Sequence, residues 1–120
     1  LEEIDIDDLL KQVHAFGPRL VVITDGPKGA YGYDGTSGWF MPPYPDPKPP
    51  LERTGAGDAF ASTVTSALAL GKSLDEALMW GPINSMSVVQ SIGAQKGLLP
   101  LVEIEKLLRD APEEYRPKVI

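Results

Sequence analysis

The sequence predicts an α/β fold from three observations: apolar residues at helical spacing, a short β-branched segment, and glycine–proline pairs that separate segments. Residues 6–13 place their apolar side chains on one helical face, and Gly17-Pro18 ends this segment. Residues 20–24 (Leu-Val-Val-Ile-Thr) then form a continuous apolar run. Such a run is typical of a buried strand, often a parallel one covered on both faces.

The composition predicts one domain with its own core and narrows the classes of function. The chain has 120 residues, 42% of them hydrophobic, and a formal net charge of −6. A negative charge argues against a nucleic-acid-binding surface, which needs a basic patch. No apolar run approaches the roughly 18 residues that span a bilayer, so we expect no membrane partner. The lack of cysteine fits a reducing cytoplasm, where we expect the protein, and argues against structural zinc.

Local signals predict the elements in the first half of the chain. Asp5 is a favourable N-cap for the first helix. Residues 30–33 and 39–41 are expected to pair as a hairpin, because Asp34-Gly35 supplies the positive φ of a tight turn. Residues 42–50 include six prolines, which predicts an extended connector. An SH3-type ligand is the alternative for this run, and we rank it lower because the run lies inside a fold-like pattern.

The second half of the chain predicts three further helices. One begins near Ala56 and ends at Gly71, and the next begins with a capping box at residues 73–76. Gly81-Pro82 is expected to kink or restart that helix. A last helix follows Pro100. The polar tail from Pro112 is expected to fray.

A loop at the end of the first predicted strand is a candidate ligand site. Ligands in open α/β sheets bind at the carboxyl ends of the strands, where Thr24, Gly26 and Gly29 lie. An ordinary turn into the next strand is the alternative reading of these residues.

The most informative stretch is Thr-Gly-Ala-Gly-Asp-Ala-Phe, residues 54–60, where a glycine turn leads directly into a helix. The backbone N–H groups of a helix start have no intrahelical partners, and the helix dipole adds positive potential there. Gly55, Ala56 and Gly57 would therefore cradle an anionic group, and Asp58 would lie beside it. A carboxylate beside a phosphate can accept a proton from an attacking hydroxyl. The alternative is that Asp58 only complements the helix dipole.

These residues resemble the C-terminal signature of the PfkB/ribokinase family of carbohydrate and nucleoside kinases. The T-x-G-x-x-G loop of residues 24–29, the T-G-A-G-D-A-F turn and the later I-G-A-Q of residues 92–95 occur in the family's order over nearly the whole chain. The resemblance implies a ribokinase-like three-layer sandwich, of which residues 1–120 would be the C-terminal portion. No Walker A motif occurs. A Rossmann fingerprint also fails, because Phe60 stands where its third glycine would be.

The resemblance further implies transfer of the γ-phosphoryl group of ATP to a hydroxyl of a sugar or nucleoside, with Mg²⁺ bridging the phosphates. By that resemblance the amides of residues 55–57 form the anion hole and Asp58 is the catalytic base. Residues 24–29 would line the phosphates and ribose of the nucleotide, and Asn84 would face the adenine.

The sequence also departs from the family pattern. Glu52-Arg53-Thr54 replaces the family's frequent D-T-T, so a monovalent cation site is doubtful. The family's frequent asparagine falls on Pro82, two residues before Asn84. The chain begins at Leu1 and lacks the family's N-terminal, sugar-binding half, which suggests a segment of something longer. Two alternatives follow: a non-catalytic nucleotide-binding or structural fragment that needs a missing partner half, and a homodimer that covers an open sheet edge.

Overall fold

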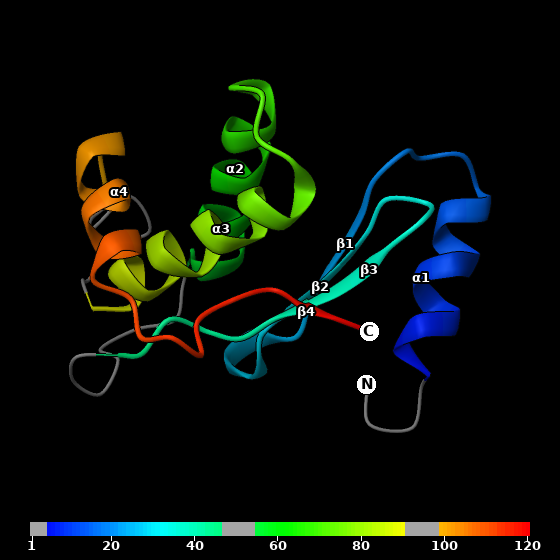
Figure 1. Ribbon diagram of the computed structural model, residues 1–120, viewed down its shortest axis with the longest axis horizontal. Helices are drawn as coiled ribbons and strands as arrows, with labels where there is room; N and C mark the ends of the chain where they lie inside the picture. Colours follow the sequence, from blue (N-terminus) through cyan, green and yellow to red (C-terminus); the bar gives the residue numbers. More distant parts are fainter. Residues whose placement is uncertain (1–4, 47–54, 91–98) are drawn as a thin grey trace.

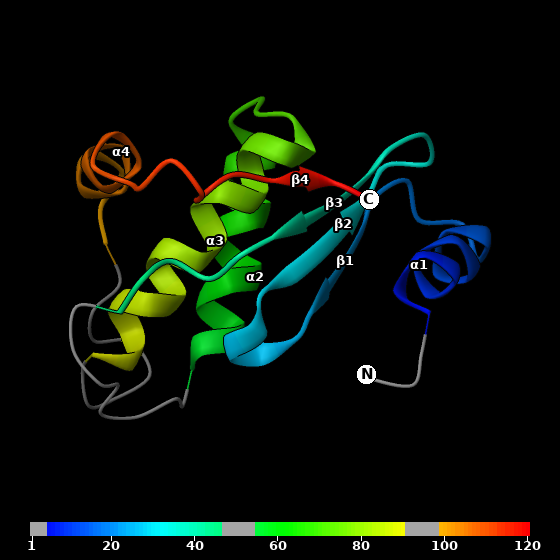
Figure 2. The same ribbon diagram turned by 60° about the horizontal axis from the view of Figure 1, so that its bottom comes forward.

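The computed structural model describes residues 5–46, 55–90 and 99–120. A four-stranded sheet lies between α1 on one side and the α2–α3 pair on the other, and α4 packs against α3 (Figure 1). The elements in chain order are α1 (Ile6–Ala15), β1 (Val21–Thr24), the 3₁₀ turn η1 (Gly26–Lys28), β2 (Ala30–Tyr33), β3 (Gly38–Met41), α2 (Ala56–Ala69), α3 (Leu74–Val89), α4 (Leu101–Arg109) and β4 (Lys118–Val119). Helix, sheet and helix form three layers, which confirms the predicted α/β sandwich (Figure 2).

The sheet is an antiparallel meander in the order β1-β2-β3-β4. Parallel pairing, which a continuous apolar run often indicates, does not occur between β1 and β2: they pair antiparallel, and β1 ends in an exposed residue. The reason is the short connection, because only residues 25–29 separate β1 from β2. A parallel crossover needs a dozen or more residues, so this turn can only reverse the chain.

The predicted hairpin is confirmed. Tyr31 lies opposite Phe40 across β2 and β3, and their ring centroids are 5.2 Å apart. Gly35 adopts a φ of 95° in the turn, as the Asp-Gly pair predicts. The Asp34 carboxylate accepts the amides of Thr36 and Ser37, which closes the loop.

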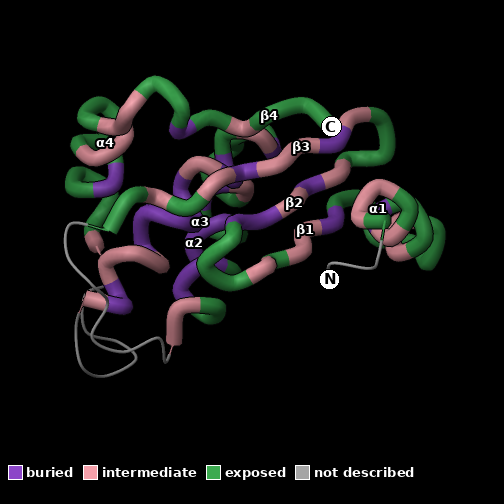
Figure 3. The backbone as a smooth tube through the Cα atoms, turned by 90° about the horizontal axis from the view of Figure 1, so that it is seen from below, coloured by how far each residue is buried: buried purple, intermediate pink, exposed green. Residues whose placement is uncertain are grey.

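The core lies between the sheet and the α2–α3 pair, where buried residues gather along both helices (Figure 3). Leu78 and Ile83 of α3 are fully buried with Ala67 of α2. The close approach of the two helices depends on Gly81, because a Cβ there would lie 2.8 Å from two atoms of the Phe60 ring. No helix in the described parts of the chain is both long and apolar enough to cross a membrane.

The predicted N-cap of α1 is confirmed, and two predictions about α3 differ from the structure. The Asp5 carboxylate accepts the amides of Asp7 and Asp8, as a predicted N-cap should. Ser73 is the N-cap of α3, but its hydroxyl donates to the Glu76 carboxylate, so the predicted capping box is not formed. The predicted restart at Pro82 was also wrong, since α3 runs through this residue as one helix.

The C-terminal tail is docked, which corrects the expectation that it frays. Tyr115 is 2% exposed, and its hydroxyl donates to the backbone oxygen of Met79 in α3. Lys118–Val119 then pairs with β3 as the fourth strand. Burial of one large aromatic ring and the strand bonds together outweigh the polar composition of the tail.

Candidate functional site

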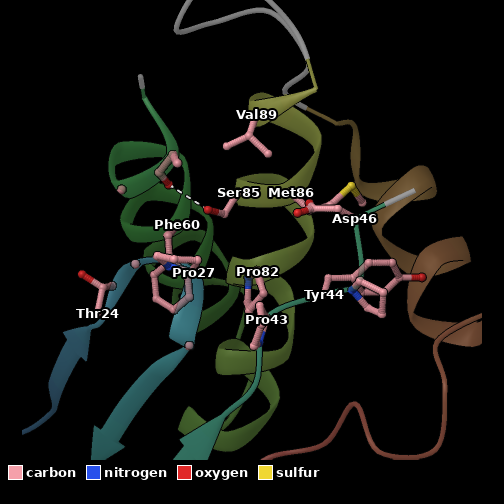
Figure 4. Close-up of a pocket in the computed structure, with 15 residues that line it drawn as sticks. Thr24, Pro27, Pro43, Tyr44, Asp46, Phe60, Pro82, Ser85, Met86 and Val89 are labelled. Carbon is pink, nitrogen blue, oxygen red and sulfur yellow. Dashed lines mark hydrogen bonds between the residues drawn. The ribbon is translucent and has the colours of Figure 1, made fainter. Parts of the chain in front are cut away.

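A cavity of about 390 Å³ lies where the β1–β2 turn, the start of α2 and one face of α3 meet (Figure 4). It brings together two motifs that are about thirty residues apart in the sequence. Thr24, Gly26 and Gly29 line it from the turn, and Ala56 and Gly57 line it from α2. The remaining lining residues are Pro27, Pro43, Tyr44, Pro45, Asp46, Phe60, Pro82, Ser85, Met86 and Val89.

The β1–β2 turn has a tightly constrained backbone. Its glycines have positive φ, 54° at Gly26 and 123° at Gly29, a region that favours glycine. The Asp25 amide donates to the Gly29 oxygen at 2.8 Å, which closes the turn. A Cβ at Gly29 would lie 2.5 Å from the Met41 oxygen, so the turn is pressed against the end of β3. This contact fixes the position of the turn at the edge of the cavity.

The start of α2 has the geometry of an anion-binding turn. Gly55 is the N-cap in the left-handed conformation, with φ 86°, and its oxygen accepts the Ala59 amide at 2.9 Å. The amides of the three residues that follow it have no partner within the helix. A Cβ built on Gly57 meets nothing within 4 Å, so there is open space beside these amides. The Ala56 carbonyl accepts a hydrogen bond from the Ser85 hydroxyl at 3.2 Å, which ties this turn to α3 (Figure 4).

Asp58 and Gly55 adjoin the cavity without lining it. Asp58 lies in the first turn of α2 with an exposed side chain, so its carboxylate is accessible from solvent. Gly55 precedes the two lining residues of α2. The structure thus places the predicted base next to the predicted anion cradle, at the rim of the cavity.

Asn84 does not line this cavity, although its neighbour Ser85 does. It is 6% exposed, its Nδ2 donates to Thr63 Oγ1 at 2.9 Å, and its Oδ1 accepts the Leu99 amide at 2.8 Å. Thr63 in turn donates to the Ala59 carbonyl at 2.6 Å. The structure therefore does not bring Asn84 to the nucleotide face expected from the sequence. Its side chain instead joins α3, α2 and the segment before α4.

Sequence reasoning missed two walls of the cavity. One is residues 43–46 of the proline-rich connector, and the other is the α3 face formed by Pro82, Ser85, Met86 and Val89. The spacing of these α3 residues, at i, i+3, i+4 and i+7, places them on one helical face and could have identified that wall. The wall is mostly apolar, which suits the flat face of an aromatic ligand.

Several predicted features fall outside the described residues. These are Thr54, the Glu52-Arg53 pair that bears on a monovalent cation, and the I-G-A-Q sequence at residues 92–95. Where the chain is described, no cluster of three or more His, Cys, Asp or Glu side chains could hold a metal ion.

Comparison with known proteins places these features in a family. A solved structure of Arabidopsis thaliana ribokinase complexed with ribose and ATP matches with a TM-score of 0.78 and 27% identity, covering 87% of this chain and 33% of that one. The fold is thus ribokinase-like. The family model of the pfkB family carbohydrate kinases matches residues 2–100, and the chain belongs to this family.

Relatives in the family are sugar and nucleoside kinases. Cytidine kinase of Thermococcus kodakarensis is 36% identical over 89 residues, which are 74% of this chain and 32% of the relative. Ribokinase of Bacillus subtilis is 33% identical over 99 residues, which are 82% of this chain and 33% of the relative. The chain therefore spans about a third of the length of the curated relatives it matches.

Proposed function

We propose that this chain forms the nucleotide site of a kinase that transfers the γ-phosphoryl group of ATP to a hydroxyl of a sugar or nucleoside. One observation carries the proposal: the glycine turn after β1 and the glycine start of α2 converge on one cavity. Family membership supports phosphoryl transfer as the class of reaction.

The start of α2 suits a phosphate group. The open space at Gly57 would let phosphate oxygens approach the free amides of the first turn, and the helix dipole favours negative charge there. No cation from a side chain is needed for this contact. Amides of Gly55, Ala56 and Gly57 would stabilise the charge that develops on the transferred group.

The apolar part of the cavity suits the base of a nucleotide. Phe60 and Met86 belong to its lining, and a volume of about 390 Å³ falls within the usual range for small-molecule pockets, roughly 300–1,000 Å³. Thr24 and the turn at residues 26–29 line the same cavity, and ribose and phosphates would contact them there. Asn84 is left out of this nucleotide site because its polar atoms are engaged elsewhere.

Asp58 would accept the proton of the attacking hydroxyl. It follows the anion cradle in sequence and has a solvent-accessible carboxylate, so an acceptor could approach it from outside the cavity. In a loose phosphoryl-transfer transition state the proton leaves late, so an ordinary carboxylate suffices. Mg²⁺, when bound with the nucleotide, would supply positive charge that offsets the negative charge of the phosphates.

The acceptor is a sugar or nucleoside hydroxyl, in keeping with the ribokinase and cytidine kinase relatives. Because the chain spans about a third of those proteins, a second candidate remains: a nucleotide-binding fragment that is inactive without a partner half. The two candidates differ in turnover and agree in nucleotide binding.

Thermal melts with and without Mg·ATP or Mg·ADP test the nucleotide site. A ligand at a hundred times its Kd stabilises the folded chain by about 2.7 kcal/mol, which raises Tm by several degrees. We expect Gly57→Leu to abolish this rise, because its side chain would fill the anion cradle. Ala61→Leu is the matched control, since Ala61 is an exposed residue of the same helix outside the cavity. An equal rise in both variants, or none in the unmodified chain, would refute the site.

The role of Asp58 is tested separately by Asp58→Asn. We expect this variant to keep the nucleotide-dependent rise in Tm and to lose phosphoryl transfer to ribose or cytidine, measured as ADP formation. Undiminished transfer would refute the assignment of the base. Nucleotide binding with no transfer by the unmodified chain would favour the non-catalytic fragment.

A further inference from the structure

The wall of the cavity formed by residues 43–46 has little backbone support of its own. Residues 42–46 belong to no helix or strand, and Pro42, Pro43 and Pro45 have no N–H to donate. Three missing N–H groups keep this segment out of the interior of a sheet, so side-chain contacts carry more of its support. Its position in the structure therefore depends on what Tyr44 and its neighbours contact.

Tyr44 is held by the C-terminal part of the chain. Its hydroxyl donates to the Leu107 carbonyl in α4 at 3.0 Å. Its ring meets the ring of Tyr115 edge to face, with centroids 4.9 Å apart and planes at 75°. Such aromatic pairs contribute about 0.5–1.5 kcal/mol beyond the area they bury.

Tyr115 connects this wall to the opposite wall of the cavity. It is 2% exposed, and its hydroxyl donates to the Met79 carbonyl of α3, one turn before the cavity residue Pro82. The same tail continues into β4, which pairs with β3 directly before the connector begins. One C-terminal segment therefore touches the connector, α3 and β3.

The C-terminal members of these contacts, Leu107, Tyr115 and β4, lie beyond residue 100, where the match to the family model ends. None of the C-terminal residues 101–120 lines the cavity. Their effect on it must therefore pass through Tyr44 and α3.

We propose that the C-terminal segment 101–120 is a positioning element for the nucleotide cavity, and that Tyr115 is its central positioning residue. The inference rests on the proposed nucleotide site. A nucleotide that contacts the connector wall binds better when Tyr115 is docked, because the wall is then already in place. By thermodynamic reciprocity, the bound nucleotide also stabilises the docked tail.

The test compares Tyr115→Leu with Ile104→Ala in the full chain. Ile104 is 4% exposed, lies in α4 and does not line the cavity, so its truncation destabilises the same region while the Tyr44 hydrogen bond to Leu107 and the Tyr44–Tyr115 ring pair stay in place. Two measurements are made on each variant: the NMR line widths of the Tyr44 and Asp46 amide signals, and the affinity for Mg·ADP by calorimetry. Both variants are studied at a temperature where they are folded.

We expect Tyr115→Leu to broaden the Tyr44 and Asp46 amide signals, because the connector loses its fixed position, and to weaken Mg·ADP binding about tenfold, the size of a typical coupling between sites. Ile104→Ala should lower Tm without either effect. Mg·ADP should slow amide hydrogen exchange at Tyr115 in the unmodified chain. Tyr115→Phe keeps the ring contact and should restore most of the affinity.

Failure of the proposed function and failure of the positioning role would give different results. Absence of Mg·ADP binding to the unmodified chain overturns the proposed function, whereas unchanged line widths of the Tyr44 and Asp46 amide signals in Tyr115→Leu overturn the positioning role. Equal losses of affinity in Tyr115→Leu and Ile104→Ala also overturn it. If Tyr115→Leu does not fold, Tyr44→Phe replaces it and should weaken binding about threefold by removing one hydrogen bond. An unchanged affinity in that variant refutes the proposal.

Discussion

Two glycines inside helices, Gly57 of α2 and Gly81 of α3, are expected to respond in opposite directions to alanine. Replacing a helical glycine with alanine normally stabilises a protein by about 0.5–1 kcal/mol, because glycine loses more backbone entropy on folding. At Gly57 a Cβ meets nothing within 4 Å, so this gain should be realised in full.

At Gly81 the same gain is opposed by sterics. The new Cβ would lie 2.8 Å from Cδ2 and Cε2 of Phe60 and 3.0 Å from its Cζ, so the ring must move. Overpacking of this kind costs about 1–3 kcal/mol, and a Cβ before Pro82 adds a clash with the proline ring. Setting the gain against these costs leaves a net loss of about 1–2 kcal/mol. A displaced Phe60 ring would also enter the cavity that it lines.

Thermal melts followed by circular dichroism measure both effects. For a domain of this size, 1 kcal/mol corresponds to about 4 °C in Tm. We expect Gly57→Ala to raise Tm by about 2–4 °C and Gly81→Ala to lower it by about 4–8 °C. Phe60→Leu removes the clashing ring atoms, so it should cost less in the Gly81→Ala background than alone. A rise in Tm for Gly81→Ala would refute the reasoning.

Three further predictions concern buried and titrating groups. Asn84→Ala should lower the unfolding free energy by about 1–3 kcal/mol, because it leaves the Leu99 amide without its partner; urea titration measures this loss. The same variant should leave the Mg·ADP affinity unchanged, which isothermal calorimetry measures. The amides of Ser37 and Thr36 hold the pKa of Asp34 below its usual value, so this carboxylate stabilises the fold above about pH 4 and that contribution is lost as the pH falls through the lower, folded pKa. Asp34→Asn should therefore show a shallower acid limb in Tm against pH, and an identical limb would contradict the prediction. Burial raises the pKa of Tyr115, so the stability that its neutral hydroxyl gives the fold is full below about pH 10 and is lost at higher pH. The variant Tyr115→Phe should therefore lose less stability between pH 9 and about 11.5 than the unmodified chain.

The sequence was most informative where the chemistry is local. The helix start at residues 55–58 needs a positive φ at Gly55, free amides and small side chains, and all three follow from the residues themselves. The N-cap at Asp5 and the hairpin turn at Gly35 are local in the same sense. These features could be predicted because each is decided within a few residues.

Features that depend on contacts between distant residues were harder to predict from the sequence. α3 is buried on nearly all sides, so its apolar pattern could not show that Asn84 faces Thr63 while Ser85 faces the cavity. Docking of Tyr115 onto α3 and Tyr44 joins residues far apart in the chain, and a polar tail gives no periodic signal of it. The antiparallel direction of β1 follows from the length of the turn after it, which the composition of the strand does not show.

The assembly of the cavity from remote segments has a consequence for the order of folding. Hydrogen bonds that secure its walls join residues 29, 36 and 63 positions apart, as in the bond from Tyr44 to Leu107. The β1–β2–β3 meander needs only short loops to close, so it carries a small entropic cost and is expected to form early. During synthesis the cavity can close only after Tyr115 has left the ribosome. Nucleotide binding would then come late, and an intermediate in which Tyr115 is not yet docked would have a formed sheet and an open site.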